Sequence, residues 1–186
     1  PRALSEDEVK RLLQAAKNSP DTLGGRAYEI ALLYLYTGMR RDELLHLEWN
    51  SVDLKARRIT VQSESEGKTF IVKTRKARVI GMAHDIVPII ERLTKTGRYV
   101  LGGDQIIEHP DSVTRAFRKI INRAKLPKDI TLHSLRHTYI THLVEKGVNP
   151  RRVQYLAGHA RFSTTERYLH VLPSDRIEED VLDFEK

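Results

Sequence analysis

The most constraining feature of the sequence is the run from residue 26 to residue 36, which is apolar on most faces of a helix. Its apolar residues are Ala27, Ile30, Ala31, Leu32, Leu33 and Leu35. A helix without a polar stripe is usually enclosed by other elements, so this run predicts a buried central helix. Gly38 supplies the residue type that commonly ends a helix.

The junction after this helix gives one arginine an unusual place. The stretch from Thr37 to Leu45 is typical of a helix end that turns at glycine directly into a second helix. Arg40 is therefore expected at a buried junction between the two helices. An isolated arginine two residues after a glycine is more often a surface side chain that covers the turn, and the pattern alone leaves both interpretations open.

Most of the remaining sequence has helical spacing. Ser5 and Glu8 form a capping-box pattern that starts a first helix, and further helices are expected at about residues 85–93 and 112–124. No stretch rich in Pro, Gly or Ser divides the chain, and its 186 residues are enough to enclose one hydrophobic core. The sequence therefore predicts a single, mostly helical domain.

A different period appears between residues 58 and 82, where apolar and polar residues alternate. This period predicts three short strands, at residues 59–61, 70–73 and 78–80. The expected fold class is α+β: a mostly α-helical domain with a small three-stranded antiparallel sheet on one side. The loop before the third strand and its flanks gather four cations, Lys73, Arg75, Lys76 and Arg78. Such a basic hairpin tip is either a solvated edge or a surface that contacts a polyanion.

The charge of the chain is unevenly distributed. The formal net charge is +7, but residues 175–186 hold six acids and two bases, a balance of −4, so the preceding residues carry +11. A domain this basic favours a polyanionic partner, and nucleic acid is favoured over an anionic membrane. Many basic proteins nevertheless bind neither. The sequence has no cysteine and no apolar run as long as a membrane helix, so a cytoplasmic protein is expected.

Four side chains suited to phosphate chemistry lie within residues 131–171. They are His133, Arg136, His159 and Tyr168. The first two are three residues apart at the start of a predicted helix, so they share one face and can reach the same bound group. Arginine forks donate paired hydrogen bonds to phosphate oxygens, and a phenol can serve as a nucleophile at phosphorus. This set therefore indicates a site for a phosphodiester.

His159 is expected just after one short helix, and Tyr168 near the start of the next. Gly158 is expected to close one helix, which places His159 just past its end. The next helix is predicted to open at Ser163, with Glu166 completing a capping box. Tyr168 would then lie in the first turns of the helix that opens at Ser163, on a short and movable element.

Other kinds of site fit the sequence less well. His133 and His137 are four residues apart, as zinc ligands often are, but no glutamate follows the first histidine and Arg136 between them would oppose a dication. No serine lies in a nucleophile-elbow context, and no glycine-rich phosphate loop is present. We therefore expect no metal, no organic cofactor and no bound nucleotide.

Five short motifs, taken in order, resemble those of the tyrosine recombinase (phage integrase) family. They are Thr37-Gly38-Met39-Arg40-x-x-Glu43-Leu44, Lys73-x4-Arg78, His133-x-x-Arg136-His137-Thr138, Gly158-His159 and Tyr168-Leu169-His170-Val171. The match spans roughly Leu4 to Leu172. Each motif alone is a weak signal, whereas all five in this order and at suitable spacing form a strong one.

The resemblance implies site-specific cleavage and rejoining of double-stranded DNA. In the family pattern, Arg40 and Arg136 would clamp the scissile phosphate. Tyr168 would attack it and form a covalent 3′-phosphotyrosine intermediate, which supports recombination, integration or excision without a cofactor. The choice among these reactions and the DNA sequence recognised do not follow from the motifs.

The same resemblance implies supporting roles for other residues. His133 and His159 would assist proton movement and bind the scissile phosphate. Lys73 would protonate the departing 5′-oxygen, and Glu43 would support the site from behind. The cations expected to contact the DNA are Arg75, Lys76 and Arg78.

Domain organisation is also suggested by the resemblance. Residues 1–172 correspond to a catalytic domain, and residues 173–186 form an acidic tail with an apolar helical stripe. Members of the family act as tetramers on DNA that exchange carboxy-terminal segments, which favours docking of this tail on a neighbouring subunit. The amino-terminal DNA-binding domain of the family is absent from the sequence, so the chain is expected to be a catalytic fragment or a short member.

Two alternative functions remain open at this point. Type IB topoisomerases resemble this family in fold and chemistry, and would relax supercoils without exchanging strands. A domain that only binds DNA would form no covalent adduct. Relaxation without strand exchange would favour the first alternative, and binding without covalent capture would favour the second.

Overall fold

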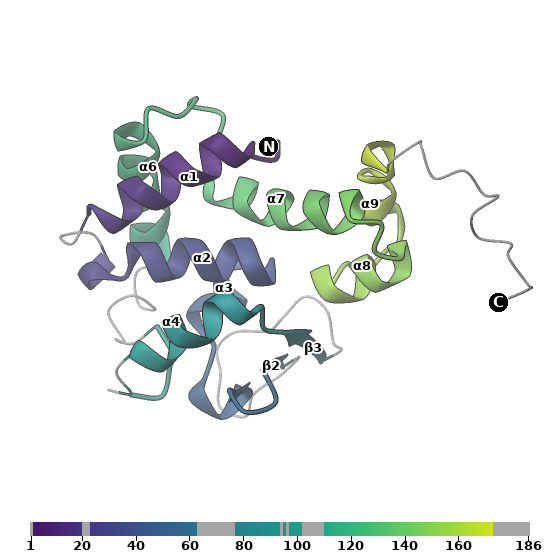
Figure 1. Cartoon of the computed structure of the whole chain (residues 1–186), viewed down its shortest axis with the longest axis horizontal. Coiled ribbons are helices and arrows are strands. Elements are labelled where there is room, and N and C mark those ends of the chain that lie inside the picture. Colours follow the sequence, from purple (N-terminus) through teal and green to yellow (C-terminus); the bar gives the residue numbers. More distant parts are fainter. Residues whose placement is uncertain are drawn as a thin grey trace, which may run out of the picture.

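The computed structural model describes residues 2–19, 23–62, 77–93, 95, 97–101 and 110–172, which form a mostly helical domain with a small sheet on one side (Figure 1). The α-helices are α1 (Glu6–Lys17), α2 (Ala27–Thr37), α3 (Arg41–Leu45), α4 (Val87–Arg92), α6 (Pro110–Arg123), α7 (Leu132–Glu145), α8 (Pro150–Ala157) and α9 (Ser163–Glu166). The 3₁₀ helices are η1 (Leu23–Gly25), η2 (Trp49–Ser51), η3 (His84–Ile86) and η4 (Leu169–Val171). None of the helices in these ranges is long and apolar enough to span a membrane.

Helix α2 lies at the centre of the fold, as its apolar sequence predicts. Ile30 and Leu33 are fully buried, and the helix packs against both α1 and α7. Gly38 ends α2 in the left-handed conformation at φ 56°. A Cβ at this position would lie 2.1 Å from Cδ1 of Tyr139 on α7, so the glycine allows the end of α2 to approach α7 closely.

Two further predicted helices are confirmed. Helix α1 begins with the predicted capping box, in which Ser5 Oγ accepts from the amide of Glu8 and the Glu8 carboxylate accepts from the amide of Ser5. Helix α6 buries the apolar side that its spacing indicates, including Val113, Phe117 and Ile120. Helix α1 packs against both α2 and α6, and all three helices contribute to the main core.

The sheet has three antiparallel strands, as predicted, but one of them differs from the prediction. Strand β2 (Arg58–Val61) pairs with β3 (Arg78–Gly81), and β1 (Val52–Asp53) pairs with the other edge of β2. The sequence pattern missed β1 because two residues are too few to show a period. The predicted strand at residues 70–73 lies outside the described residues.

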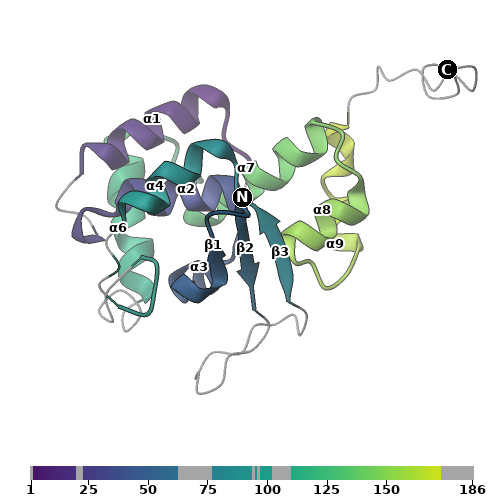
Figure 2. The same ribbon diagram turned by 60° about the horizontal axis from the view of Figure 1, so that its bottom comes forward.

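Helix α8 lies beside β3, on the side that does not pair with β2 (Figure 2). The hydroxyl of Tyr155 accepts a hydrogen bond of 2.9 Å from the amide of Val79, which satisfies a backbone group at this edge. A second, smaller core joins α7 and α8 through Ile140 and Val153. The end of α8 is therefore held between the sheet and α7.

The last short helix starts at Ser163, as predicted, but without the predicted capping box. Helix α9 has only four residues, and Phe162, which cannot cap with its side chain, precedes it, while Ser163 is already helical. Thr165 is buried and its Oγ1 lies 2.9 Å from Nδ1 of His159, so a side-chain contact rather than a cap ties this helix to the site. Tyr168 therefore follows α9 and precedes η4, rather than lying in the first turns of a helix.

Candidate active site

The centre of the site is a buried carboxylate held by two arginines. Oε1 of Glu43 accepts from Nη1 of Arg40 and Nη1 of Arg78, each at 2.9 Å. Oε2 accepts from the backbone amide of Arg40 and from Nη2 of Arg78, each at 2.7 Å. Glu43 lies in the first turn of α3, and Arg78 begins β3, so this arrangement joins the predicted junction to the sheet. Arg40 therefore takes part in a buried ion pair and does more than cover the turn.

The carboxyl end of α8 is bound by three arginines in succession. Nε of Arg78 donates to the carbonyl of Leu156, Nη2 of Arg136 donates to that of Ala157, and Nη2 of Arg40 donates to that of Gly158. The donor–acceptor distances are 3.0, 2.6 and 2.6 Å, in that order. The last carbonyls of a helix lack partners within the helix and carry partial negative charge, so guanidinium groups stabilise them.

Gly158 is required by this close approach. Its φ is +66°, and a Cβ there would lie 2.7 Å from Nη1 of Arg78 and 3.3 Å from Nη1 of Arg40. A side chain would therefore push the two arginines away from the helix end. His159 follows directly, so the arginine cluster also fixes where this histidine enters the site.

The charges of the site do not balance. Burial would raise the pKa of Glu43, but the hydrogen bonds and charge of Arg78, with those of Arg40, lower it to about 2. Burial, reinforced by Arg40, lowers the pKa of Arg136 to about 10, which leaves this guanidinium charged at neutral pH. Three guanidinium groups thus face one carboxylate, and Arg136 donates its hydrogen bonds to the neutral carbonyls of Gly38 and Ala157. Such a surplus favours binding of an anion.

Two of the predicted histidines lie beside these arginines and are neutral at neutral pH. Desolvation, then the charges of Arg136 and Arg40, lower the pKa of both His133 and His159, that of His159 to about 4. Nδ1 of His159 lies 2.9 Å from Oγ1 of the buried Thr165, which orients the ring. Neutral imidazoles in a cationic site can accept protons or donate hydrogen bonds to a phosphate without adding to the charge.

Tyr168 lies against this group. Its ring is stacked on that of His159, with centroids 6.3 Å apart, and it packs on the smaller core between α7 and α8. Burial raises the pKa of its phenol, while the charge of Arg136 opposes the increase. The structure therefore brings together five of the six predicted catalytic residues, Arg40, His133, Arg136, His159 and Tyr168.

One site residue, His137, appeared in the sequence as a possible metal ligand and as part of a family motif, but no role in the reaction was assigned to it. Its Nδ1 lies 2.6 Å from the hydroxyl of Tyr168. The signal that could have revealed it is its spacing, since it lies one helical turn after His133 on the same face of α7, with ring centroids 4.9 Å apart. Among the described residues, no group of three or more His, Cys, Asp or Glu side chains could hold a metal ion.

The predicted basic hairpin needs one correction. Arg78 was expected to contact DNA from an exposed tip, but it is 3% exposed and is engaged by Glu43 and the carbonyl of Leu156. Strand β3 begins at Arg78 and turns this side chain into the protein, which the local sequence does not reveal. Lys73, Arg75 and Lys76 lie outside the described residues.

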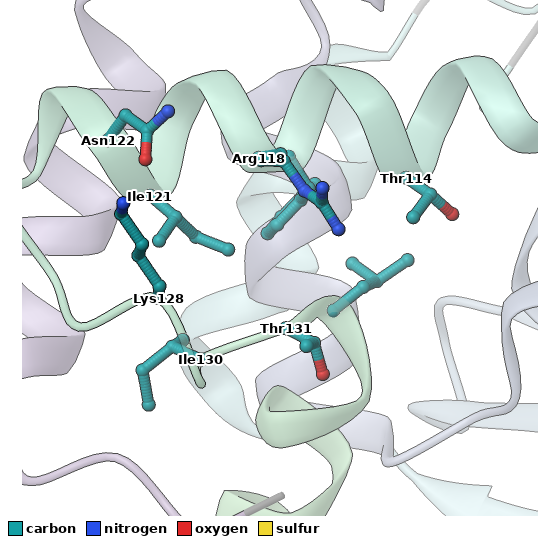
Figure 3. Close-up of a pocket in the computed structure, with 9 residues that line it drawn as sticks. Thr114, Arg118, Ile121, Asn122, Lys128, Ile130 and Thr131 are labelled. Carbon is teal, nitrogen blue, oxygen red and sulfur yellow. The ribbon is translucent and has the colours of Figure 1, made fainter.

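Two adjoining hollows lie on the α6 side of the site. The first, of about 420 Å³, is lined by residues that include Arg40, His133 and Arg136. The second, of about 340 Å³, shares Thr114, Thr131 and Leu132 with the first. Its lining also includes the cations Arg118 and Lys128, from α6 and from the segment that leads into α7 (Figure 3). Positive side chains therefore continue from the site along α6.

Sequence comparison identifies the family. The profile described as "Phage integrase family" matches residues 2–175, nearly the whole chain. The chain belongs to the phage integrase family. It is 33% identical over 181 residues to a protein of Thermosipho africanus named tyrosine recombinase, with 96% of this chain and 60% of that protein covered.

Solved structures of the family have the same fold. The crystal structure of XerA recombinase aligns with a TM-score of 0.71 and 29% identity, covering all of this chain and 66% of that one. The catalytic domain of bacteriophage HP1 integrase also gives a TM-score of 0.71, at 25% identity, covering 98% of this chain and 95% of that domain. The chain spans about 60% of the length of the curated relatives it matches.

The buried ion pair predicts a strong and pH-dependent effect of Glu43→Gln. Removing one partner of a buried pair leaves Arg78 uncompensated, so the free energy of unfolding should fall by about 3–5 kcal/mol at pH 7. The folded protein holds the pKa of Glu43 at about 2, below its ordinary 4.5. The advantage of the wild type is therefore complete above about pH 4.5 and is lost as the pH falls toward 2.

Urea unfolding at several pH values measures this difference, and Asp7→Asn is the matched control. Asp7 is paired with Arg11 but its side chain is 77% exposed, so its substitution should cost about 1 kcal/mol or less. A loss for Glu43→Gln no larger than that for Asp7→Asn would contradict the role assigned to the pair.

Proposed function

We propose that this chain cleaves and rejoins DNA strands at specific sites through a covalent 3′-phosphotyrosine intermediate. The observation that carries the proposal is the position of Tyr168, whose phenol lies beside an anion-binding cluster of arginines and neutral histidines. The names of the related proteins, tyrosine recombinase and integrase, support the same reaction.

The arginines would bind the scissile phosphate. Attack at phosphorus concentrates negative charge on the nonbridging oxygens, and donors that are already in place stabilise that charge most effectively. Arg40 and Arg136 border the same hollow and are fixed by Glu43 and the α8 carbonyls, so they need not reorganise when the charge develops. His133 borders the same hollow, and His159 adjoins the cluster, so both can supply further hydrogen bonds.

Tyr168 would serve as the nucleophile and later as the leaving group. Its oxygen forms a bond to phosphorus while the bond to the 5′-oxygen breaks, and the 3′-phosphate stays on the protein. A phenol has a pKa near about 10, so phenoxide leaves far more readily than an alkoxide and the 5′-hydroxyl can reverse the step without ATP. Lys73 would protonate the departing 5′-oxygen.

Double-stranded DNA would follow the positive side of the site. The residues before 175 carry a net charge of +11, and the hollow beside α6 adds Arg118 and Lys128 next to the phosphate site. Arg75 and Lys76 are proposed to reach the DNA from the hairpin, whereas Arg78 would act inside the protein by holding Glu43. Contacts of this kind with the phosphate backbone lose strength as salt is added.

Assembly on DNA would involve the acidic tail. Residues 173–186 lie outside the described residues, and their apolar stripe includes Ile177, Val181 and Leu182. We propose that four copies assemble on DNA and that each tail docks on a neighbouring copy, which would couple one active site to the next. An apolar helical face of this kind fits a groove on a partner.

Tyr168→Phe should abolish the covalent adduct and retain DNA binding, because it removes only the nucleophilic oxygen. The assay uses nicked suicide duplexes with a randomised core, captures protein–DNA adducts in detergent and sequences the DNA that is captured. Tyr28→Phe is the control and should form adduct normally. An undiminished yield of adduct in Tyr168→Phe, mapped to Tyr28, Tyr34 or Tyr155, would contradict the proposal. Separately, relaxation of supercoiled DNA without strand exchange would indicate a topoisomerase.

Lys73→Ala should slow cleavage of ordinary DNA on the order of 10²-fold or more, since a general acid matters most for a poor leaving group. A 5′-bridging phosphorothiolate should restore most of the rate, because its sulfur leaves without a proton. Lys68→Ala and Lys76→Ala should weaken binding in a salt-dependent manner and show no selective rescue. Rescue that follows either of these lysines instead would show that Lys73 is not the general acid.

Removal of the residues after Pro173 should weaken assembly on DNA while the monomer still folds, because the described core ends before them. Light scattering with a duplex that carries two copies of the captured site measures the assembly, and circular dichroism measures folding. Unchanged assembly would place the tail on its own protomer.

A further inference from the structure

The hydroxyl of Tyr168 forms a short hydrogen bond that the proposed mechanism has not used. Its oxygen lies 2.6 Å from Nδ1 of His137, and the two rings are tilted with centroids 5.4 Å apart. His137 lies on α7, in the interior of the site, and is half-buried. A nucleophile that must lose its proton during attack is therefore already bonded to a group that can take one.

The surroundings of His137 keep its imidazole neutral. His133 and Arg136 flank it on α7, and Tyr168 and His159 face it from the segments after α9 and α8. Burial, then His133 and Arg136, lower the pKa of His137 to about 4, so the imidazole is neutral and keeps a lone pair. Burial raises the pKa of Tyr168, so the phenol keeps its proton and can donate it to Nδ1 when the imidazole carries its own hydrogen on Nε2.

The other histidine that contacts Tyr168 is less suited to this task. Nδ1 of His159 is engaged with Oγ1 of Thr165 at 2.9 Å, and its ring stacks on the phenol ring rather than meeting the hydroxyl. His133 meets the edge of the His137 ring and borders the hollow that contains Arg40 and Arg136. The three histidines thus have different neighbours, and His137 is the one bonded to the reacting oxygen.

We propose that His137 is the general base that activates Tyr168. In cleavage, the bond from the phenol oxygen to phosphorus forms, the bond to the 5′-oxygen breaks, and the phenol proton moves to Nδ1 of His137. A separate acid protonates the 5′-oxygen. In rejoining, the imidazolium returns its proton to the departing phenol oxygen. This inference rests on the proposed phosphotyrosine reaction and deepens it.

A bound phosphodiester would make His137 a stronger base. An imidazolium beside Arg136 is costly in the free protein, because both charges are positive and partly desolvated. The scissile phosphate brings a negative charge to the same arginines and offsets that repulsion. Proton transfer to His137 is therefore favoured once the DNA phosphate is in place, and is disfavoured without it.

The main test is the pH dependence of covalent capture by His137→Asn, in which the amide oxygen can replace Nδ1 as an acceptor but cannot take a proton. The nicked duplex is the sequence captured by the wild type. The variant should lose on the order of 10²–10⁴-fold in cleavage rate. The wild-type rate should level off above the pKa of the base, whereas the variant rate should keep rising with pH.

Matched variants separate chemistry from folding. His142→Gln lies on the same helix with an exposed side chain and should match the wild type in rate and pH profile. His137→Gln offers a second amide if the asparagine variant unfolds, and added imidazole should restore part of the rate of His137→Ala. In ¹⁵N-labelled free protein, NMR should show His137 with its hydrogen on Nε2, because Nδ1 accepts from Tyr168.

The outcomes distinguish the two proposals. If the wild type forms the adduct and both folded amide variants keep the wild-type rate and pH profile, the role of His137 is overturned. The phosphotyrosine reaction itself would stand. A hydrogen on Nδ1 in the NMR spectrum would also overturn the role of His137. Absence of any wild-type adduct would overturn the phosphotyrosine reaction itself, and with it the role of His137, whatever the NMR shows.

Discussion

The carboxylate of Glu43 is the interaction on which the site depends. It is fully buried, and four hydrogen bonds from Arg40 and Arg78 satisfy both of its oxygens. A buried charge of this kind is stable only while its partners remain, so the α2–α3 junction and the first residue of β3 must stay in register with each other. The two arginines, together with Arg136, then reach the carbonyls at the end of α8. One buried charge thus aligns four segments that are distant in sequence.

In the same arrangement, the arginines carry the positive charge and the histidines are the groups that can accept a proton. The arginines remain charged, and together with desolvation they keep His133, His137 and His159 neutral in the free protein. A site of neutral imidazoles and charged guanidiniums can bind a phosphodiester and still accept a proton. Binding of the anion would raise the basicity of the histidines, so the protonation chemistry becomes favourable only when a substrate is present.

Tyr168, the proposed nucleophile, is held by packing rather than by a regular helix. Tyr168 lies between the four-residue α9 and the 3₁₀ helix η4, and it rests on the small core between α7 and α8. Short elements of this kind have few internal hydrogen bonds, so their position depends on side-chain contacts. The bonds of His137 to Tyr168 and of Thr165 to His159 supply such contacts at the site itself. Rearrangement of this segment would therefore change the nucleophile and its surroundings together.

The sequence by itself determined the elements whose signals are local. The apolar run of α2, the glycine at position 38 and the capping box of α1 each predict a structure that the chain adopts, because spacing and backbone preference act within a few residues. The order of the motifs also indicated the family and most of the site. The change of period predicted a small sheet and two of its strands, β2 and β3, but not β1.

Tertiary structure decided the features that depend on residues far apart in the chain. Whether Arg78 faces DNA or Glu43 depends on where β3 lies relative to α3, and no local pattern contains that information. The sequence did not reveal the hydrogen-bond partner of Tyr168 for the same reason. His137 precedes Tyr168 by 31 residues, and the two side chains meet only because α7 and the segment after α9 pack together.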